Sequence, residues 1–228
     1  MRTLIAGYGE IGYALYQILR DYPIGYVDID KKGHRIEFEI PEQVEILHIC
    51  FGYSDKFIDY VKQYQEEFKP KYTIIYSTVD IGTTRKLGAI HSPVTGKHPF
   101  LEDSFRTFAR PLAGERTSEV ADYFRRVGLK ICLYEKPETT EAGKLFELRR
   151  YGVMIEMVKE FKEQCDKLQI PFHEAYTLMT QNYNQGYQKL DNEEFTMPIL
   201  QPIMKPIGGH CIRENAPLSS SKFNQFLV

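Results

Sequence analysis

The stretch Thr3-Leu4-Ile5-Ala6-Gly7-Tyr8-Gly9-Glu10-Ile11-Gly12 decides the fold of this 228-residue chain. A short apolar run leads directly into three glycines with the spacing GxGxxG, and apolar residues then recur at helical spacing as far as Leu19. Pro23 ends that helix, and residues 25–28 form a second apolar run. The stretch therefore predicts a strand–helix–strand unit at the start of a parallel sheet.

The same alternation of strand and helix continues as far as Pro137. Further strands are expected at 44–51, 72–76, 88–91 and 130–134, with a hairpin or edge strand at 35–40. Helices are expected at 54–68, with Ser54 as N-cap, and at 115–127. This order predicts an α/β fold, a Rossmann-type doubly wound, mostly parallel sheet, in a nucleotide-binding domain over residues 1–137.

The second region, residues 138–228, has a different pattern. One helical stripe runs from 141 to 168 and carries six acidic and six basic residues, which indicates a mixed, solvated outer face. A helix of that length is about 42 Å long, too long for the side of a sheet domain. We therefore expect it to pack against a second copy of the chain, in a homodimer. Residues 172–196 look partly helical, and 197–211 form a Pro/Gly-rich loop.

Composition excludes several classes of protein. Lys and Arg number 29 against 31 Asp and Glu, so there is no basic footprint for nucleic acid or for a membrane surface. No apolar run approaches the ~20 residues that span a bilayer. The four cysteines are scattered without a CxxC pair, and the six histidines show no ligand spacing. We expect a cytoplasmic protein with no metal site and a small-molecule substrate.

The glycine stretch has the context that dinucleotide binding needs. Gly7 allows a tight turn, Gly9 lets a pyrophosphate approach the backbone, and Gly12 permits close packing of helix on strand. Backbone N–H groups of the first helical residues, Glu10 and Ile11, face the phosphates. The purely structural alternative is a glycine turn without a ligand.

The acidic residue at the end of the second strand favours NAD as the cofactor. Asp28 is placed to accept the ribose hydroxyls, and Asp30 is positioned to assist it. A carboxylate there repels the 2′-phosphate of NADP. The nearby cations Lys31, Lys32 and Arg35 favour the opposite preference.

Two residues are candidates for chemistry. Cys211 follows two glycines and His210, which leaves a thiol accessible for nucleophilic attack, although most lone cysteines are small core residues. Lys144 lies on the apolar stripe of the long helix, where it can stabilise an oxyanion, or simply extend to water. His91 and His98 flank a Pro/Gly loop near the carboxyl edge of the sheet, and either is a candidate base or a solvated loop residue.

Together these segments resemble the UDP-glucose/GDP-mannose dehydrogenase family, within the wider group of 6-phosphogluconate and 3-hydroxyacid dehydrogenases. The matching segments occur in the family's order: 7–12 with Asp28, Ser77-Thr78-Val79 with Gly82-Thr83-Thr84, Glu141-Ala142-Gly143-Lys144-Leu145 and Gly208-Gly209-His210-Cys211. The resemblance implies that Cys211 is the nucleophile and that Lys144 stabilises oxyanions. It places Ser77 and Thr78 at the cofactor, with Thr78 also near the substrate, and implies a substrate loop at His91-Ser92-Pro93.

Four departures from the family pattern change the expected substrate. Val94, Leu148 and Asn215 replace the family's glutamate, asparagine and aspartate, and the sequence ends 17 residues after Cys211, without the family's second Rossmann-like domain. We therefore expect an NAD-dependent dehydrogenase for a smaller, anionic or sugar-like alcohol, with positive charge from Lys97, His98, Arg106 and Arg110. The alternatives are a single-step 3-hydroxyacid-type dehydrogenase that uses Lys144 without Cys211, and a non-catalytic NAD-binding regulator.

Overall fold

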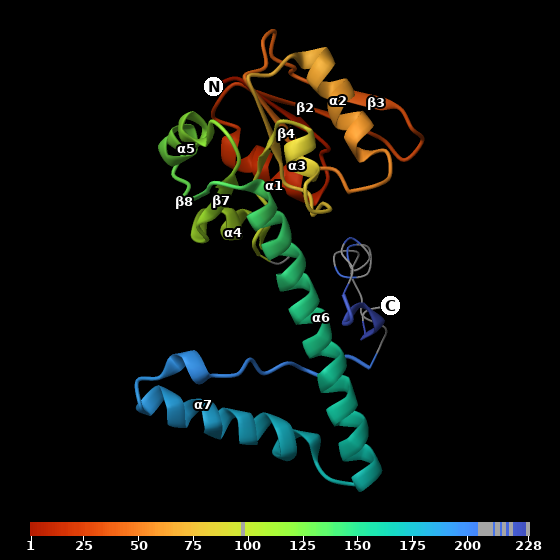
Figure 1. Cartoon of the computed structure of the whole chain (residues 1–228), viewed down its shortest axis with the longest axis vertical. Helices are drawn as coiled ribbons and strands as arrows, with labels where there is room; N and C mark the ends of the chain where they lie inside the picture. Colours follow the sequence, from red (N-terminus) through yellow and green to blue (C-terminus); the bar gives the residue numbers. More distant parts are fainter. Residues whose placement is uncertain (97–98, 205–211, 213–214, 216–217, 219–220, 227–228) are drawn as a thin grey trace. The chain divides into compact units, whose positions relative to one another are not determined.

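The computed structural model describes residues 1–96, 99–204, 212, 215, 218 and 221–226. The chain divides into two compact units, Met1–Leu145 and Phe146–Val228. The long helix α6 (Pro137–Leu168) contributes its first turns to the first unit and the rest to the second (Figure 1).

An eight-stranded sheet forms the centre of the first unit, in the order β3-β2-β1-β4-β5-β6-β7-β8. Parallel pairs join β2, β1, β4, β5 and β6, while β3 is antiparallel to β2 and β7 is antiparallel to β6. The predicted doubly wound, mostly parallel sheet is confirmed, and residues 35–38 are its antiparallel edge. The strands are β1 (Thr3–Ala6), β2 (Ile24–Ile29), β3 (Arg35–Phe38), β4 (Ile46–Ile49), β5 (Tyr72–Ile75), β6 (Ile90–His91), β7 (Arg110–Ala113) and β8 (Ile131–Tyr134).

Helices cover both faces of the central strands β1, β4 and β5, so every residue of these three strands is buried. One core cluster joins strand residues such as Ile5 to α1 (Glu10–Leu19), α4 (Leu101–Thr107) and α5 (Thr117–Arg126). The opposite cluster joins Leu4 and Ala6 to α2 (Phe57–Phe68) and to Leu87, directly after the short helix α3 (Thr83–Lys86). Alternate side chains of β1 thus enter opposite cores, as the period of a strand requires.

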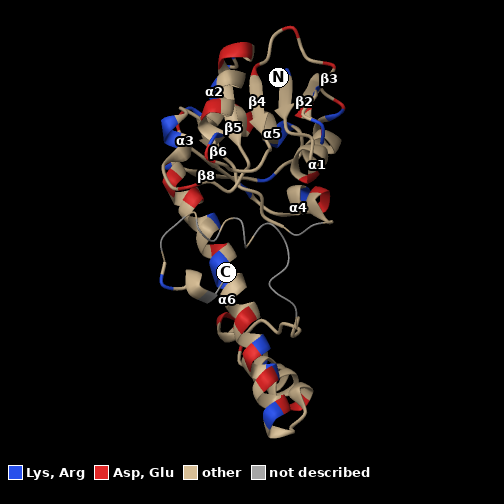
Figure 2. Cartoon of the chain, turned by 90° about the vertical axis from the view of Figure 1, so that its right-hand side faces the viewer, with Lys and Arg blue, Asp and Glu red and all other residues tan. Residues whose placement is uncertain are grey.

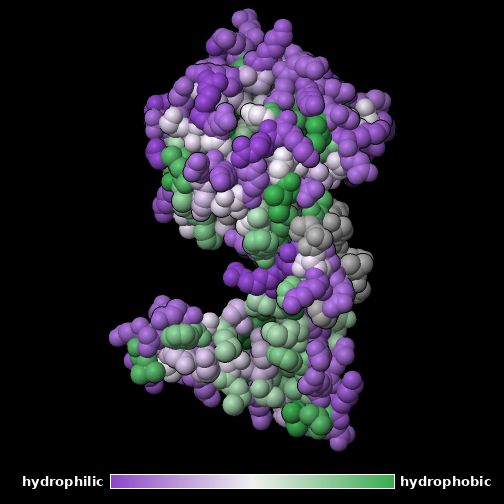
Figure 3. Space-filling model, in the orientation of Figure 1, coloured by the Kyte–Doolittle hydropathy of each residue, from purple (hydrophilic) through white to green (hydrophobic). Residues whose placement is uncertain are grey.

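The second unit has very little core of its own. After α6 come a π-helical stretch η1 (His173–Leu178), α7 (Met179–Lys189) and the 3-10 turns η2 (Glu193–Phe195) and η4 (Asn224–Phe226). Among the described residues of this unit, the buried apolar side chains are only Val158, Cys165 and Ile212. Figure 2 shows acidic and basic residues interspersed along α6, as the sequence predicts. Figure 3 shows apolar side chains on the surface around α6 and α7.

The structure corrects several element boundaries. The long helix begins at Pro137, earlier than residue 141, because proline is well suited to the first helical position. The N-cap of α2 is Lys56, and Ser54 only accepts a hydrogen bond from Phe57 N through its backbone carbonyl. The sequence interpretation missed α4 and β7 altogether. No helix among the described residues is long and apolar enough to cross a membrane.

Candidate functional site

The glycine turn joins β1 to α1 at the carboxyl edge of the parallel sheet. Gly7 has φ +94°, and a Cβ there would lie 2.9 Å from Phe51 N. A Cβ on Gly12 would lie 2.0 Å from Gly7 O, so the helix packs on the turn itself. A Cβ on Gly9, by contrast, would have no heavy atom within 4 Å. Gly7 and Gly12 are therefore required by the fold, whereas the absence of a side chain at Gly9 leaves open space before the helix.

The amino terminus of α1 presents its first backbone N–H groups to that open space. Gly9 is the N-cap and has no side chain to accept a hydrogen bond, and Glu10 and Ile11 form the first turn. A helix start without a side-chain cap suits an anionic group, because the helix dipole places partial positive charge at this end. The residues at this turn therefore fit the pyrophosphate of a dinucleotide.

The acidic groups at the end of β2 have different surroundings. The half-buried Asp28 accepts a hydrogen bond from Ile29 N at 2.8 Å through one carboxylate oxygen. Asp30 instead accepts bonds from Lys32 N and His34 N, both at 2.8 Å, and these backbone bonds lower the pKa of Asp30. Asp30 thus closes its own turn, which corrects the expectation that it assists Asp28.

The cation Arg35 is held by acidic neighbours. Its guanidinium binds the Glu67 carboxylate through two nitrogens, at 3.0 and 2.5 Å, and lies 2.6 Å from Glu37. These ion pairs raise the pKa of Arg35, chiefly through Glu67. Arg35 therefore has two carboxylates to satisfy it, and it offers less to a 2′-phosphate than the sequence suggests.

The first two turns of α6 contact the loops that follow β5 and β6. Glu141 is fully buried, and its carboxylate accepts bonds from Gly82 N at 2.6 Å and Thr84 N at 2.8 Å. Lys144 Nζ donates to Val94 O at 2.8 Å. The segments 82–84, 91–94 and 141–145, far apart in the chain, therefore meet at one edge of the sheet.

Two further contacts complete this junction. Arg85 and Glu138 form a two-pronged ion pair, which lowers the pKa of Glu138 to about 2. His91 is fully buried, with Nδ1 2.8 Å from Thr140 Oγ1 and Nε2 3.3 Å from Ser77 O. Burial lowers the pKa of His91 to about 4, and the positive charge of Lys144 contributes in the same direction. A neutral, enclosed imidazole is suited to joining the loop after β5, through Ser77 O, to α6, through Thr140 Oγ1.

The other predicted site residues lie in both units of the chain. Ser77 is buried and donates to Phe51 O at 2.5 Å, while Thr78 next to it is half-buried. Val94, which replaces the family's glutamate, lies in the apolar core. Leu148 packs with Ile212 in the second unit, and Asn215 also belongs to that unit. Lys97, His98 and Cys211 lie outside the described residues.

Two residues of this junction have roles that sequence reasoning did not assign. Glu141 was visible only as part of a matching segment, and its partners lie 57 and 59 residues away. Arg110 was expected to face a substrate but is 3% exposed and donates to Ser92. No local signal distinguishes a buried arginine from a surface one. Within the part of the chain described here, no group of three or more His, Cys, Asp or Glu side chains is placed to hold a metal.

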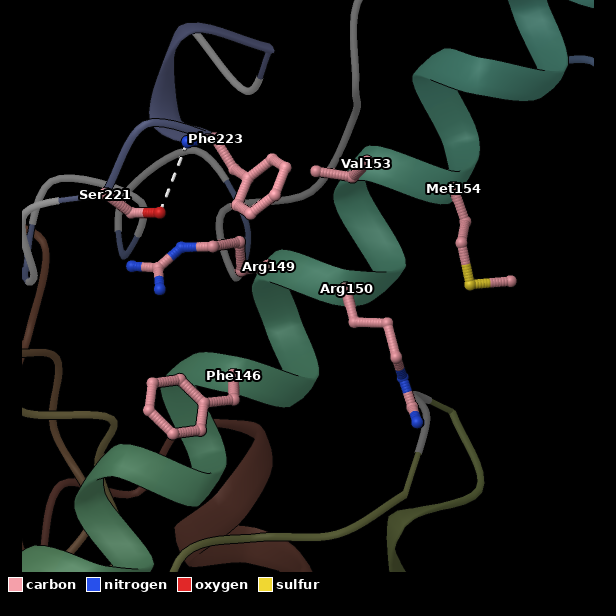
Figure 4. A pocket seen from close by; sticks show the side chains of 7 residues that line it. All are labelled: Phe146, Arg149, Arg150, Val153, Met154, Ser221 and Phe223. Carbon is pink, nitrogen blue, oxygen red and sulfur yellow. Dashed lines mark hydrogen bonds between the residues drawn. The ribbon is translucent and has the colours of Figure 1, made fainter.

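A cavity of about 440 Å³ lies in the second unit and contains none of the predicted site residues. Arg149 points toward Ser221 and Phe223, whereas Arg150 and Met154 point away from them (Figure 4). The two guanidinium groups therefore do not converge on one ligand position. The cavity is lined by Phe146, Arg149, Arg150, Val153, Met154, Ser221 and Phe223.

No protein-family model and no curated protein matches the chain. Among solved structures, the UDP-D-ManNAc dehydrogenase of Pyrococcus horikoshii is similar at 18% identity and TM-score 0.77, over 100% of this chain and 67% of that one. The 3-hydroxyisobutyrate dehydrogenase of Mycobacterium tuberculosis is 12% identical, with TM-score 0.66, over 100% of this chain and 91% of that one. Psf3, in complex with NADP+ and 2-OPP, is 11% identical, with TM-score 0.52, over 99% and 98%.

This chain thus spans about two thirds of the nucleotide-sugar dehydrogenase and most of the hydroxyacid dehydrogenase. At these identities the likeness concerns the fold. The chain has the fold shared by nucleotide-sugar and 3-hydroxyacid dehydrogenases.

Proposed function

We propose that the chain is an NAD-dependent dehydrogenase that removes hydride from an alcohol carbon of a small, anionic or sugar-like substrate. The observation that carries this proposal is that the first turns of α6 meet both loops, Glu141 the loop after β5 and Lys144 the loop after β6. These loops leave the same sheet edge as the glycine turn, since β1, β4, β5 and β6 are parallel. Open α/β sheets bind their ligands at this edge.

The glycine turn and Asp28 support NAD as the cofactor. The open space at Gly9 accommodates a pyrophosphate, and the Asp28 carboxylate at the end of β2 is suited to ribose hydroxyls and repels a 2′-phosphate. Arg35, engaged with Glu67 and Glu37, offers little compensation for that repulsion. Because a protein of the same fold is known with NADP+, binding of both cofactors has to be compared.

The proposed chemistry assigns one task to each residue. NAD, when bound, supplies the hydride acceptor. The hydroxyl proton of the substrate passes to solvent water, the Lys144 ammonium stabilises the oxyanion that this leaves, and Thr78 lies beside the reacting carbon. His91, buried and neutral, holds the loop after β5 against α6 and does not itself contact the substrate. Cys211 would add a covalent step, in which its thiolate attacks the carbonyl product and permits a second oxidation.

A single oxidation that uses Lys144 without Cys211 is the second candidate. The observation that favours it is the contact of Lys144 Nζ with Val94 O at the sheet edge, which involves no contribution from Cys211. A hydroxyacid also matches the expected anionic substrate.

Both candidates are tested by mixing the protein with NAD and a panel of 2- and 3-hydroxyacids, sugars and nucleotide sugars, and following NADH absorbance. One NADH per substrate molecule supports the single oxidation, and two support the covalent route. Binding of NAD without turnover of any compound would assign the chain to the non-catalytic regulators.

We also propose a homodimer built on α6. Phe146, Met157 and Leu168 are 59%, 42% and 69% exposed, and their spacing of eleven residues puts them on one face of the helix. A second copy offers the same stripe with the same mixed charges, so the two surfaces are self-complementary. Val158, although on the predicted stripe, is 1% exposed in its own unit and so belongs to the interior.

A further inference from the structure

Arg110, in β7, carries a buried positive charge and has no acidic partner within the part of the chain that the structure describes. The side chain is 3% exposed, and no carboxylate of the described residues forms an ion pair with it. Its guanidinium lies 3.9 Å from the ring centre of Phe105 and 5.4 Å from that of Tyr76. Such ring contacts compensate part of the lost hydration. Packing alone does not explain the charge, because an apolar side chain of similar volume is often as stable at such a position.

The hydrogen bonds of Arg110 go to the start of the loop after β6. Nη2 donates to Ser92 O at 3.0 Å and to Ser92 Oγ at 3.2 Å. Ser92 N in turn donates to Ile75 O at 2.8 Å, which ties the same residue to the end of β5. Ser92 is therefore held on both sides, and the direction in which the loop leaves the sheet is fixed.

Two residues further on, this loop supplies the acceptor for Lys144. Val94 O, 2.8 Å from Lys144 Nζ, follows Ser92 after the stiff residue Pro93. We propose that Arg110 is a positioning residue for Lys144: by fixing Ser92 it fixes Val94 O, and with it the place of the ammonium group. The consequence for catalysis rests on the proposed function, whereas the mechanical link does not.

The link is tested by the reactivity of Lys144 in the protein without cofactor or substrate. The full chain is treated with N-hydroxysuccinimidyl acetate, which acylates uncharged amines, and each lysine is quantified by peptide mass spectrometry. In Arg110→Met the loop loses its anchor, so the bond from Lys144 Nζ to Val94 O is weakened and Lys144 should be acylated about threefold faster or more. Lys62 and Lys189, both exposed, should react as in the wild type.

Arg125→Met is the matched control, because Arg125 is an exposed arginine on α5 that pairs with Asp122 of the same helix. It should leave the acylation of Lys144 unchanged. Arg110→Lys keeps the charge but not the planar group that reaches both Ser92 oxygens, and it should change Lys144 in the same direction by a smaller factor.

An unchanged rate at Lys144 in folded Arg110→Met overturns the proposal, and so does failure of both Arg110 variants to fold, which would assign the residue to core stability. Because no turnover is measured, absence of dehydrogenase activity leaves this result standing. If a substrate is found, Arg110→Met should lower kcat more than it changes the Kd for NAD.

Discussion

Alanine should affect cofactor binding at Gly9 but folding stability at Gly12, although only three positions separate the two glycines. Gly9 has φ −74°, which any residue can adopt, and a Cβ there meets no atom within 4 Å. At Gly12 a Cβ would lie 2.0 Å from Gly7 O and 3.1 Å from Ile5 Cγ2. Gly9→Ala should therefore fold normally and fail in cofactor binding, whereas Gly12→Ala should be damaged in its fold.

The structure sets the sizes of these effects. At Gly12 the carbonyl of Gly7 must retreat by about 1 Å, and such overpacking costs about 1–3 kcal/mol. Better helix propensity returns up to about 1 kcal/mol, so we expect a net loss of about 1 kcal/mol, or about 2–4 °C in Tm. Gly9→Ala loses only a weak N-cap preference, less than about 1 kcal/mol. Its methyl group occupies the proposed pyrophosphate position and should weaken NAD binding about tenfold or more.

Thermal unfolding and calorimetric NAD titration of the two variants provide the measurements. If Gly9→Ala is stable and binds NAD with full affinity, the open space at Gly9 does not hold the pyrophosphate. An unchanged Tm in Gly12→Ala would refute the close packing of helix on turn.

Four further predictions concern single side chains. Asp28→Ala should weaken NAD binding by about 1–3 kcal/mol in calorimetry, with little change in Asp30→Ala, whose carboxylate closes its own turn. Because burial lowers the pKa of His91 from 6.5 to about 4, the unfolded chain binds the extra proton, so stability is lost as pH falls from 6.5 to 4. In His91→Gln the free energy of unfolding, measured with urea, should fall by about 3 kcal/mol less between pH 6.5 and pH 4 than in the wild type. Met157→Glu should convert a dimer to a monomer in light scattering; a wild-type monomer would contradict the proposal. If Cys211 is a nucleophile, iodoacetamide should label it faster than the other cysteines, and equal labelling would contradict the covalent step.

The central strands of the first unit could be predicted from the sequence because they are buried on both faces. Continuous apolar runs and glycine punctuation mark β1, β2, β4 and β5, so their order predicted a parallel sheet. The segment 100–113 was missed because α4 is only seven residues long and β7 contains Pro111 and the charged Arg110. Short elements that depend on tertiary contacts leave little periodicity to detect.

For the candidate site, the sequence motifs indicated which segments to compare but not which contacts those segments make. The glycine turn is local, and its sterics follow from the spacing. The Glu141 carboxylate binds Thr84 N, 57 residues away, and the buried His91 contacts Thr140, 49 residues away. The buried Arg110 donates to Ser92, 18 residues away. Sequence spacing therefore suggested a solvated histidine and a substrate-facing arginine where the fold encloses both.

The account is tested most directly by NADH formation in the wild type and in Lys144→Ala, each with a measured Kd for NAD. We predict that the wild type reduces NAD with at least one hydroxyacid or sugar of the panel. Lys144→Ala should bind NAD with unchanged affinity but produce no NADH, because the ammonium group acts on the substrate oxygen. Wild-type protein that binds neither NAD nor NADP, or Lys144→Ala with full turnover, would contradict the account.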